Sequence, residues 1–163
     1  MGVTAGPAEW WVASPEAIDS LLISCPVATT LPDGSRIICK SGGTAWIVAP
    51  ETTQVGSAWA GGQYNSTSVG AKCCICEWSG LETQLINCGF NPSDWFVPSL
   101  SQLQNPGFVC RTNWDSFSIA LYWSSSERNA VRAYNLNYSN SCVDCCWKPP
   151  PALCVRAFRC VTY

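Results

Sequence analysis

The stretch that says most about the fold runs Asn91-Pro92-Ser93-Asp94-Trp95-Phe96-Val97-Pro98-Ser99-Leu100-Ser101-Gln102-Leu103. Pro98 and the serine after it predict the start of a short helix. Asp94 precedes a bulky aromatic residue, so we expect a half-buried carboxylate that accepts hydrogen bonds from nearby backbone N–H groups. Trp95 has the size that fills a core in a chain with many loops. We therefore interpret Asp94, Trp95 and Pro98 as scaffold residues and not as a site.

A second motif follows further along the chain, Leu121-Tyr122-Trp123-Ser124-Ser125-Ser126-Glu127. Trp123 again has the size of a core residue. The hydroxyl groups of residues 124–126 can satisfy loop backbone where no strand ladder does. Trp123 and Ser124 therefore join the predicted scaffold.

The sequence around these motifs predicts short helices and strands. We expect helices from Pro15 to near Cys25, over residues 81–88 and from residue 98 to about 105, and strands over 36–40, 45–49, 108–111, 119–124, 131–137 and 157–161. Residues 50–72 are rich in Gly, Ser and Thr and predict a long surface loop. This mixture predicts an α+β fold with little regular structure and much loop.

Composition excludes several classes of protein. The chain has 163 residues, a net charge of −2 and only 12% charged side chains, with 9 tryptophans. Such a chain is not disordered, and it lacks the basic field of a nucleic-acid-binding protein. Its apolar runs are far shorter than the ~18 residues that cross a bilayer, so we expect no membrane insertion.

The absence of histidine excludes Ser-His-Asp and Cys-His catalysis. The three lysines, Lys40, Lys72 and Lys148, lie in loop-like contexts, and no pair of carboxylates is spaced suggestively. We therefore expect no enzyme, no catalytic residues, no resident metal and no cofactor.

Cysteine is the most unusual feature of the composition. The twelve disulfide candidates are Cys25, Cys39, Cys73, Cys74, Cys76, Cys88, Cys110, Cys142, Cys145, Cys146, Cys154 and Cys160. The first nine residues lack the basic and apolar regions of a secretory signal, yet disulfides persist in oxidising surroundings. Three hypotheses reconcile these facts: metal-bound thiolates in a reducing cell, a mature secreted fragment, or a particle component made inside a cell that works outside it after lysis. We favour the third.

The spacing of the cysteines keeps two questions open. Cys-x-x-Cys steps at Cys73–Cys76 and Cys142–Cys145 can build a zinc site, but they lie far apart in the sequence and leave eight cysteines unexplained. Disulfides account for all twelve. Neighbours on a strand point to opposite faces, so each member of the doublets Cys73-Cys74 and Cys145-Cys146 takes a different partner. Either all bridges are internal, or at least one joins another chain through Cys73, Cys74, Cys145 or Cys146.

Several segments together resemble the Lcl C-terminal domain family, which is named for a collagen-like bacterial adhesin and recurs in phage tail and fibre proteins. Residues 88–103 resemble its "DWRLPT-x-x-EL" signature and residues 121–127 its "YWSST" strand, while residues 45–50, 130–134 and 155–161 are similar to its opening, next and closing strands. Phe96 stands where the family has arginine, and most members hold fewer cysteines. The resemblance implies a C-type lectin-like fold over residues 35–163, with two short helices on a small twisted antiparallel sheet and long disulfide-braced loops.

Binding is a more natural function for such a chain than catalysis. The calcium-binding "EPN" and "WND" triplets of C-type lectins are absent, but aromatic residues in loops can stack on sugars, and the candidates are Trp59, Tyr64, Trp78 and Trp114. Residues 111–163 hold 6 basic and 3 acidic side chains, against 3 and 8 in residues 1–110. The arginines either pair with the acidic part or form a face for sulfated polysaccharide, as in adhesins of the family.

Residues 1–34 fall outside the resemblance. Their apolar side chains, too few to form a core alone, are Trp10, Trp11, Ile18, Leu21 and Leu22. This segment with its short helix either packs back on the lectin-like domain or docks on a partner as an arm.

These features together predict a phage virion structural or accessory protein, in a tail fibre or baseplate, that acts by assembly and by contact with the host surface. Its expected partners are other virion proteins, disulfide-linked to it or not, further copies of itself, and a host surface glycan. The alternative is a free or surface-bound, extracellular adhesin that binds glycans.

Overall fold

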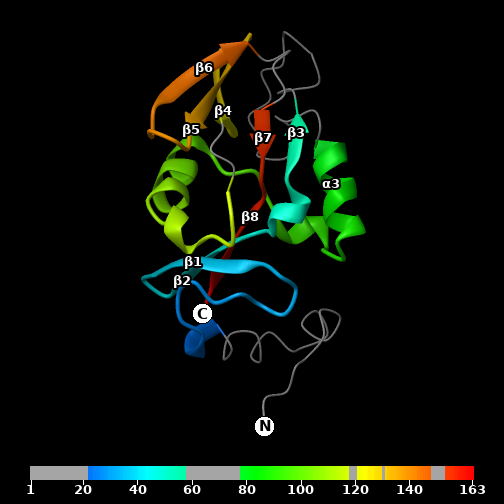
Figure 1. The fold of residues 1–163 in the computed structure, drawn as a ribbon, viewed down its shortest axis with the longest axis vertical. Coiled ribbons are helices and arrows are strands. Elements are labelled where there is room, and N and C mark those ends of the chain that lie inside the picture. The colour runs from blue at the N-terminus through cyan, green and yellow to red at the C-terminus, as the bar shows by residue number, and fades with distance from the viewer. Residues whose placement is uncertain (1–21, 58–77, 118–120, 130, 148–152) are drawn as a thin grey trace.

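The computed structural model describes residues 22–57, 78–117, 121–129, 131–147 and 153–163 (Figure 1). These residues form a mixed α+β fold with eight strands in two sheets and few, short helices. The predicted α+β class is therefore confirmed. None of the described helices is long and apolar enough to cross a membrane.

The first sheet pairs two strands from the beginning of the described chain with the last strand of the chain. It has the order β1 (Arg36–Ser41), β2 (Thr44–Val48) and β8 (Phe158–Thr162), and all its pairs are antiparallel. β1 and β2 form a hairpin through Gly42 and Gly43, whose φ angles of 57° and 75° suit glycine. These strands were predicted within a residue or two, because β-branched residues and a glycine pair mark them.

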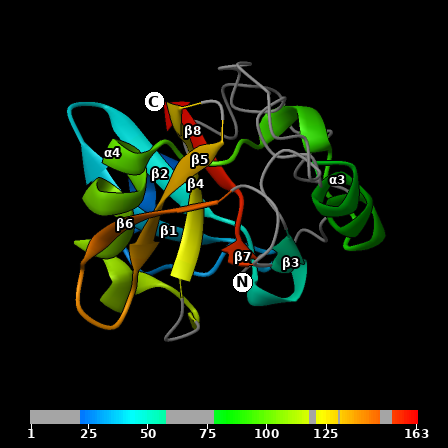
Figure 2. The same ribbon diagram turned by 90° about the horizontal axis from the view of Figure 1, so that it is seen from above.

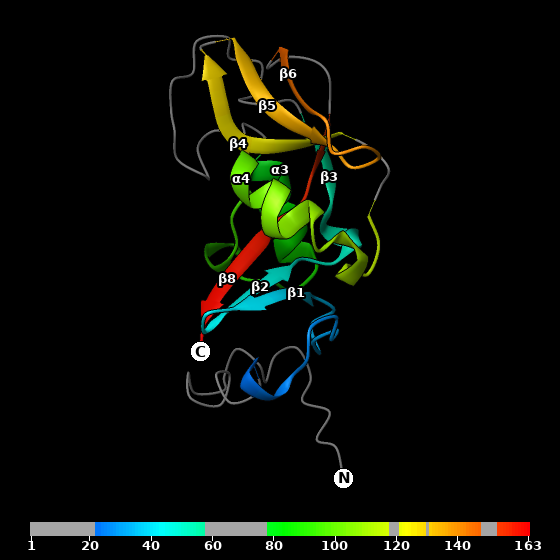
Figure 3. The same ribbon diagram turned by 90° about the vertical axis from the view of Figure 1, so that its left-hand side faces the viewer.

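The second sheet has the order β3-β7-β4-β5-β6. Its strands are β3 (Val55–Ser57), β7 (Leu153–Val155), β4 (Leu121–Asn129), β5 (Arg132–Asn137) and β6 (Val143–Trp147). The last residues of the chain pass from β7 in this sheet to β8 in the other, so they join the two sheets (Figure 3). β3, β6 and β7 were not predicted, because they are short and lack a run of β-branched residues.

Two helices flank the sheets. α3 (Trp78–Asn87) contacts β3, and α4 (Leu100–Gln102) contacts β4 and β5 on the other side of the molecule (Figure 2). Single helical turns lie at Glu51–Thr53 (η1), Pro92–Asp94 (η3) and Arg111–Asn113 (η5), and Leu103–Phe108 (η4) is a helical segment with a kink at Asn105. The strand predicted over 108–111 is wrong: backbone N–H groups of Val109 and Cys110 bond back to Gln104 and Pro106, which continues the helical path.

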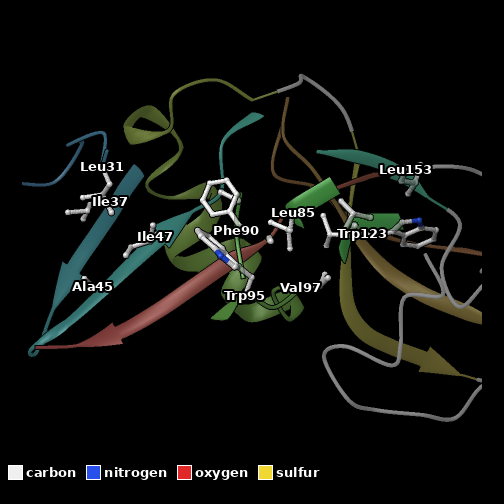
Figure 4. Close-up of a cluster of buried hydrophobic side chains, with 14 of the residues drawn as sticks. Leu31, Ile37, Ala45, Ile47, Leu85, Phe90, Trp95, Val97, Trp123 and Leu153 are labelled. Atoms are coloured by element: carbon white, nitrogen blue, oxygen red, sulfur yellow. The ribbon is translucent and has the colours of Figure 1, made fainter. Parts of the chain in front are cut away.

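Alternate residues of the strands enter two hydrophobic clusters. On β7, Leu153 and Val155 belong to the first cluster and Cys154 packs against the second; on β4, Trp123 belongs to the first and Tyr122 to the second. Because successive side chains on a strand point to opposite faces, the clusters lie on opposite faces of the sheets. Figure 4 shows the first cluster, which reaches from the β1–β2 hairpin past Trp95 to β4 and β7. Strands buried on both faces explain why the chain holds so few charges.

Residues 22–34 pack onto this core. Leu22 is 1% exposed and Leu31 is also buried in the first cluster. Backbone hydrogen bonds join Ala28 and Thr29 to Ile37, so the segment before β1 is bound to that strand. The ammonium group of Lys40 donates hydrogen bonds to the carbonyl groups of Leu22, Ile23 and Cys25, at the end of a helical turn over residues 22–24. A cation there satisfies carbonyls that a helix C-terminus leaves unpaired.

Candidate interaction surface

The two sequence motifs meet and hold each other in place. The N–H of Ser125 donates to the carbonyl of Pro98 at 2.9 Å, and the hydroxyl of Ser126 accepts from the N–H of Leu100 at 2.9 Å. The hydroxyl of Ser124 donates to the carbonyl of Tyr134 at 2.8 Å. β4 is irregular between Trp123 and Glu127, and the three serines supply the hydrogen bonds that a regular ladder lacks there. The predicted scaffold residues Ser124 and Pro98 therefore both lie where the two motifs meet.

The residues around Asp94 also serve the scaffold. Trp95 is 1% exposed and packs edge-on against Phe90 at 5.3 Å, and Trp123 is equally buried. Asp94 is half-buried at the end of η3, but within the described part of the chain its carboxylate receives none of the expected backbone hydrogen bonds. Asn91 accepts from the N–H of Ser93 at 3.2 Å, so the asparagine caps this turn.

Phe96, where the resemblance has arginine, is half-buried and packs against the second hydrophobic cluster. Its backbone exchanges two hydrogen bonds with Phe158 on β8, at 2.9 and 2.8 Å. Its ring lies edge-on to that of Trp46 at 6.3 Å.

Of the aromatic residues proposed for glycan contact, Trp114 is the one whose side chain the structure describes. Trp114 is 4% exposed and packs against Tyr122, Tyr138 and Phe158, with ring centroids 5.2 to 6.2 Å apart. This prediction is wrong for Trp114, because the loop that carries the ring folds it into the second cluster. Trp78 is the first residue of α3 and not a loop residue. Trp59 and Tyr64 lie outside the described residues.

The predicted docking arm is described only in part. Trp10, Trp11, Ile18 and Leu21 lie outside the described residues. Leu22 packs back on the domain, whereas its neighbour Ile23 is 61% exposed.

An exposed strip follows edge strand β6. β6 is the last strand of the second sheet, and no described strand pairs with its outer edge. Val143, Cys145 and Trp147 alternate along it and share one face. Val143 and Trp147 are 42% and 50% exposed. The guanidinium group of Arg132, opposite Trp147 on β5, lies 5.0 Å from the centre of the Trp147 ring. We call Val143, Cys145, Trp147, Arg128 and Arg132 the β6 strip.

The doublet Cys145-Cys146 behaves as predicted for neighbours on a strand. Cys146 packs against the first cluster and accepts a hydrogen bond from Asn135 at 3.2 Å. Burial raises the pKa of the Cys146 thiol. The sulfur of Cys145 instead contacts the exposed guanidinium group of Arg128, and this hydrogen bond raises the pKa of the arginine. Because Cys145 lies on the outer face beside this cation, it is the member of the doublet placed to meet another molecule.

A hollow adjoins the strip. It is lined by Gln104, Phe108, Val109, Leu136 and Ser141 and has a volume of about 340 Å³. Leu136 pairs directly with Val143 across the β5–β6 ladder, so the hollow and the strip are continuous. Val109 is 64% exposed at its rim. Exposed apolar side chains beside an open strand edge are typical of a surface that binds another protein.

The described cysteines are present as thiols. None of the nine cysteines in the described residues has a second sulfur at bonding distance, and Cys73, Cys74 and Cys76 lie outside them. Within the same residues no three cysteine, aspartate or glutamate side chains gather as metal ligands. Internal bridging of these nine is therefore not seen in the structure.

The arginines of the C-terminal third mostly contact aromatic rings. Arg111 lies 3.8 Å from the ring of Phe108 and Arg156 lies 5.2 Å from that of Trp114. Arg156 is 2% exposed between β7 and β8, where it donates to the carbonyl groups of Ala49 and Ser116 and forms an ion pair with Asp115. Arg156 is therefore a structural residue and not part of a polysaccharide face.

Sequence reasoning missed Val143 and Trp147 as members of a surface, whereas Arg128 and Arg132 belong to the arginines that it considered as a polysaccharide face. The alternation of Val143, Cys145 and Trp147 was the available signal, but the cysteine doublet masked the period of two. Neither a protein-family model nor a curated protein matches the chain.

Proposed function

We propose that this chain is a structural or accessory protein of a phage virion, a tail-fibre or baseplate component, that works by assembly with other subunits through the β6 strip. In this proposal it transforms no substrate and holds no cofactor. The observation that carries the proposal is an outward-facing thiol, Cys145, between the exposed Val143 and Trp147 on an open strand edge.

Each part of the β6 strip suits a subunit contact. No described strand pairs with the outer edge of β6, so a strand from a partner can pair there, which gives affinity through main-chain hydrogen bonds. Trp147 and Val143 supply apolar area, and aromatic residues are enriched at the centre of protein interfaces. Cys145 can then form a covalent bond to a partner cysteine once the particle leaves the reducing cell.

We further propose a C-type lectin-like fold with disulfide-braced loops, as the resemblance implies. Two observations support the fold: short helices flank a twisted, largely antiparallel sheet arrangement, and the two resembling motifs, at residues 91–103 and 121–127, are hydrogen-bonded to each other. The abundance of cysteine supports the bracing.

Electrophoresis of purified phage particles tests the assembly role. Without reductant we expect this chain in a band heavier than its 17.7 kDa, and with reductant we expect it at that mass. Cys145→Ser should abolish the heavier band, whereas Cys146→Ser, the inward-facing neighbour, should retain it. Absence of the chain from the particles refutes the proposal, and a monomer band without reductant refutes the covalent attachment.

Glycan binding by a free or surface-bound adhesin is the second candidate function. One observation favours it: Trp147 is 50% exposed and the guanidinium group of Arg132 lies against its ring. An exposed aromatic ring beside a cation suits an acidic or sulfated sugar. A glycan array that includes sulfated polysaccharides tests this function. Binding that Trp147→Ala abolishes and Ile23→Ala retains would favour the adhesin, and no binding to any glycan would exclude it.

A further inference from the structure

Two cysteines that are far apart in the sequence lie near each other beside the β1–β2 hairpin. Cys39 lies on β1, and Cys110 lies directly before η5. Both side chains are half-buried and pack against the second hydrophobic cluster. η5 contacts β1, and the Cys39 side chain is the neighbour that, together with burial, raises the pKa of the Cys110 thiol.

The backbone on both sides of the pair is fixed. The side-chain amide of Asn113 donates to the carbonyl of Ile38, next to Cys39, at 2.9 Å. The Nε of Arg36 donates to the carbonyl of Asn113 at 2.6 Å, and the N–H of Asn113 donates to the carbonyl of Cys110 at 2.9 Å. η5 is thus bound to β1 beside the two cysteines, so the fold keeps these two side chains close to each other.

Other described cysteines are less suited to Cys39. Cys160 lies two strands away in the same row, since Cys39 and Cys160 both pair with Trp46. Adjacent strands are about 4.8 Å apart, which places these Cα atoms roughly 10 Å from each other, beyond the ~7 Å limit of a disulfide. Cys154, which packs against the same cluster, accepts a hydrogen bond from Gln54 at 3.4 Å.

We propose that Cys39 and Cys110 form an intrachain disulfide that ties β1 to the η4–η5 segment. The proposal specifies one pairing within the disulfide bracing proposed above, and it does not depend on the assembly role or on Cys145. Because η4 also lines the hollow beside the β6 strip, the bond would fix one wall of that hollow.

The bond forms by thiol–disulfide exchange with a small-molecule disulfide such as oxidised glutathione. The thiolate of Cys39 attacks one glutathione sulfur and releases the other glutathione as a thiol, which leaves a mixed disulfide on Cys39. Cys110 then loses its proton, attacks the Cys39 sulfur and releases the second glutathione. Two protein thiols are oxidised and one glutathione disulfide is reduced to two thiols. Burial and the neighbouring Cys39 raise the pKa of Cys110 to about 11, which assigns Cys110 to the second, intramolecular step.

Peptide mapping of the full-length protein tests the pairing. The protein is equilibrated with oxidised and reduced glutathione, its remaining thiols are alkylated in the folded state, and it is digested without reductant by trypsin and chymotrypsin. Cleavage places Cys39 in Ile37–Lys40 and Cys110 in Val109–Arg111. We expect these two peptides as one linked species, about 2 Da lighter than their sum, which separates on reduction.

Serine variants provide the controls. Cys39→Ser and Cys110→Ser should each remove the linked species and leave the other cysteine alkylated, while Cys160→Ser should retain it. Cys39 and Cys110 both alkylated in the oxidised wild-type protein, or either one linked to a different cysteine, would overturn the pairing. The wild-type digest decides this even where a variant fails to fold. Since the digest uses the isolated chain, a negative result leaves the particle experiment with Cys145 unaffected.

Discussion

Arg156 is the single side chain whose loss we expect to destabilise the fold most. It is 2% exposed and binds Ala49 at the end of β2, Ser116 and Asp115, so it joins the β7–β8 link to two other segments. Removal of Arg156 leaves the buried carbonyl group of Ala49 and the carbonyl group of Ser116 without their donors, while the exposed carboxylate of Asp115 is hydrated. We expect Arg156→Met to lower the free energy of unfolding by about 3 kcal/mol in urea titrations. Arg132→Met, at the surface, should change it by less than about 0.5 kcal/mol, and equal effects would contradict the structural role.

Asp115 makes the ion pair with Arg156 sensitive to pH. Burial alone would raise the pKa of Asp115, but the Arg156 guanidinium and the N–H groups of Ser116 and Glu51 outweigh it, and the pKa lies below its ordinary value of 3.8. A carboxyl group with a lowered pKa stabilises the fold above the pKa of its unfolded form and loses that contribution as the pH falls through the lower, folded value. We expect the difference in unfolding free energy between wild type and Asp115→Asn to shrink as the pH falls from 6 to about 2.5. A difference that is independent of pH would contradict the assignment.

At the scale of elements, α4 depends on a hydroxyl from another part of the chain. Ser99 and Gln102 form a capping box within the helix, and Ser126 on β4 accepts from the N–H of Leu100. A serine that satisfies a free N–H group at a helix N-terminus contributes about 1 kcal/mol. We therefore expect Ser126→Ala to lower the unfolding free energy by about 1 kcal/mol in urea titrations. Ser41→Ala, at the exposed end of β1, should have no measurable effect, and a neutral Ser126→Ala would remove the evidence that the two motifs support each other.

The elements show how far local sequence determines this fold. Local sequence predicted β1, β2, β5, β8 and α3, because the hydrophobic period and the turn residues there indicate the same elements. β6 was not predicted, since its sequence of valine, aspartate, two cysteines and tryptophan has no strong strand preference, and pairing with β5 decides its conformation. The strand predicted at Phe108–Arg111 failed for the opposite reason: its residues favour a strand, but hydrogen bonds to Gln104 and Pro106 hold them in a helical path.

At the scale of the whole molecule, the candidate surface was less predictable than the core. Trp123 and Trp95 were assigned to the core from size alone, and both are buried. Trp114 and Trp147 have the same chemistry, yet the first is buried and the second is half-exposed. The loop after η5 folds Trp114 into the second cluster, whereas Trp147 lies on edge strand β6, beyond which no strand is described. The alternation that places Cys145 outward and Cys146 inward could be inferred from sequence, but the arginine beside Cys145 could not.

The bond proposed between Cys39 and Cys110 has a consequence for the stability of the whole molecule. It would close a loop of about 70 residues, and a bridge of this kind contributes roughly 3 kcal/mol, or about 6–12 °C in Tm for a chain of this size. We expect the double variant Cys39→Ser/Cys110→Ser to melt below wild type by about this amount in oxidising buffer. Reductant should lower the wild-type Tm and narrow the difference in Tm between wild type and the double variant. The two serines change the packing equally in both buffers, but wild type has the disulfide only in the oxidising buffer. Cys160→Ser should follow wild type in both. A difference in Tm that stays constant between the buffers would mean that the two thiols contribute only by packing against the second cluster.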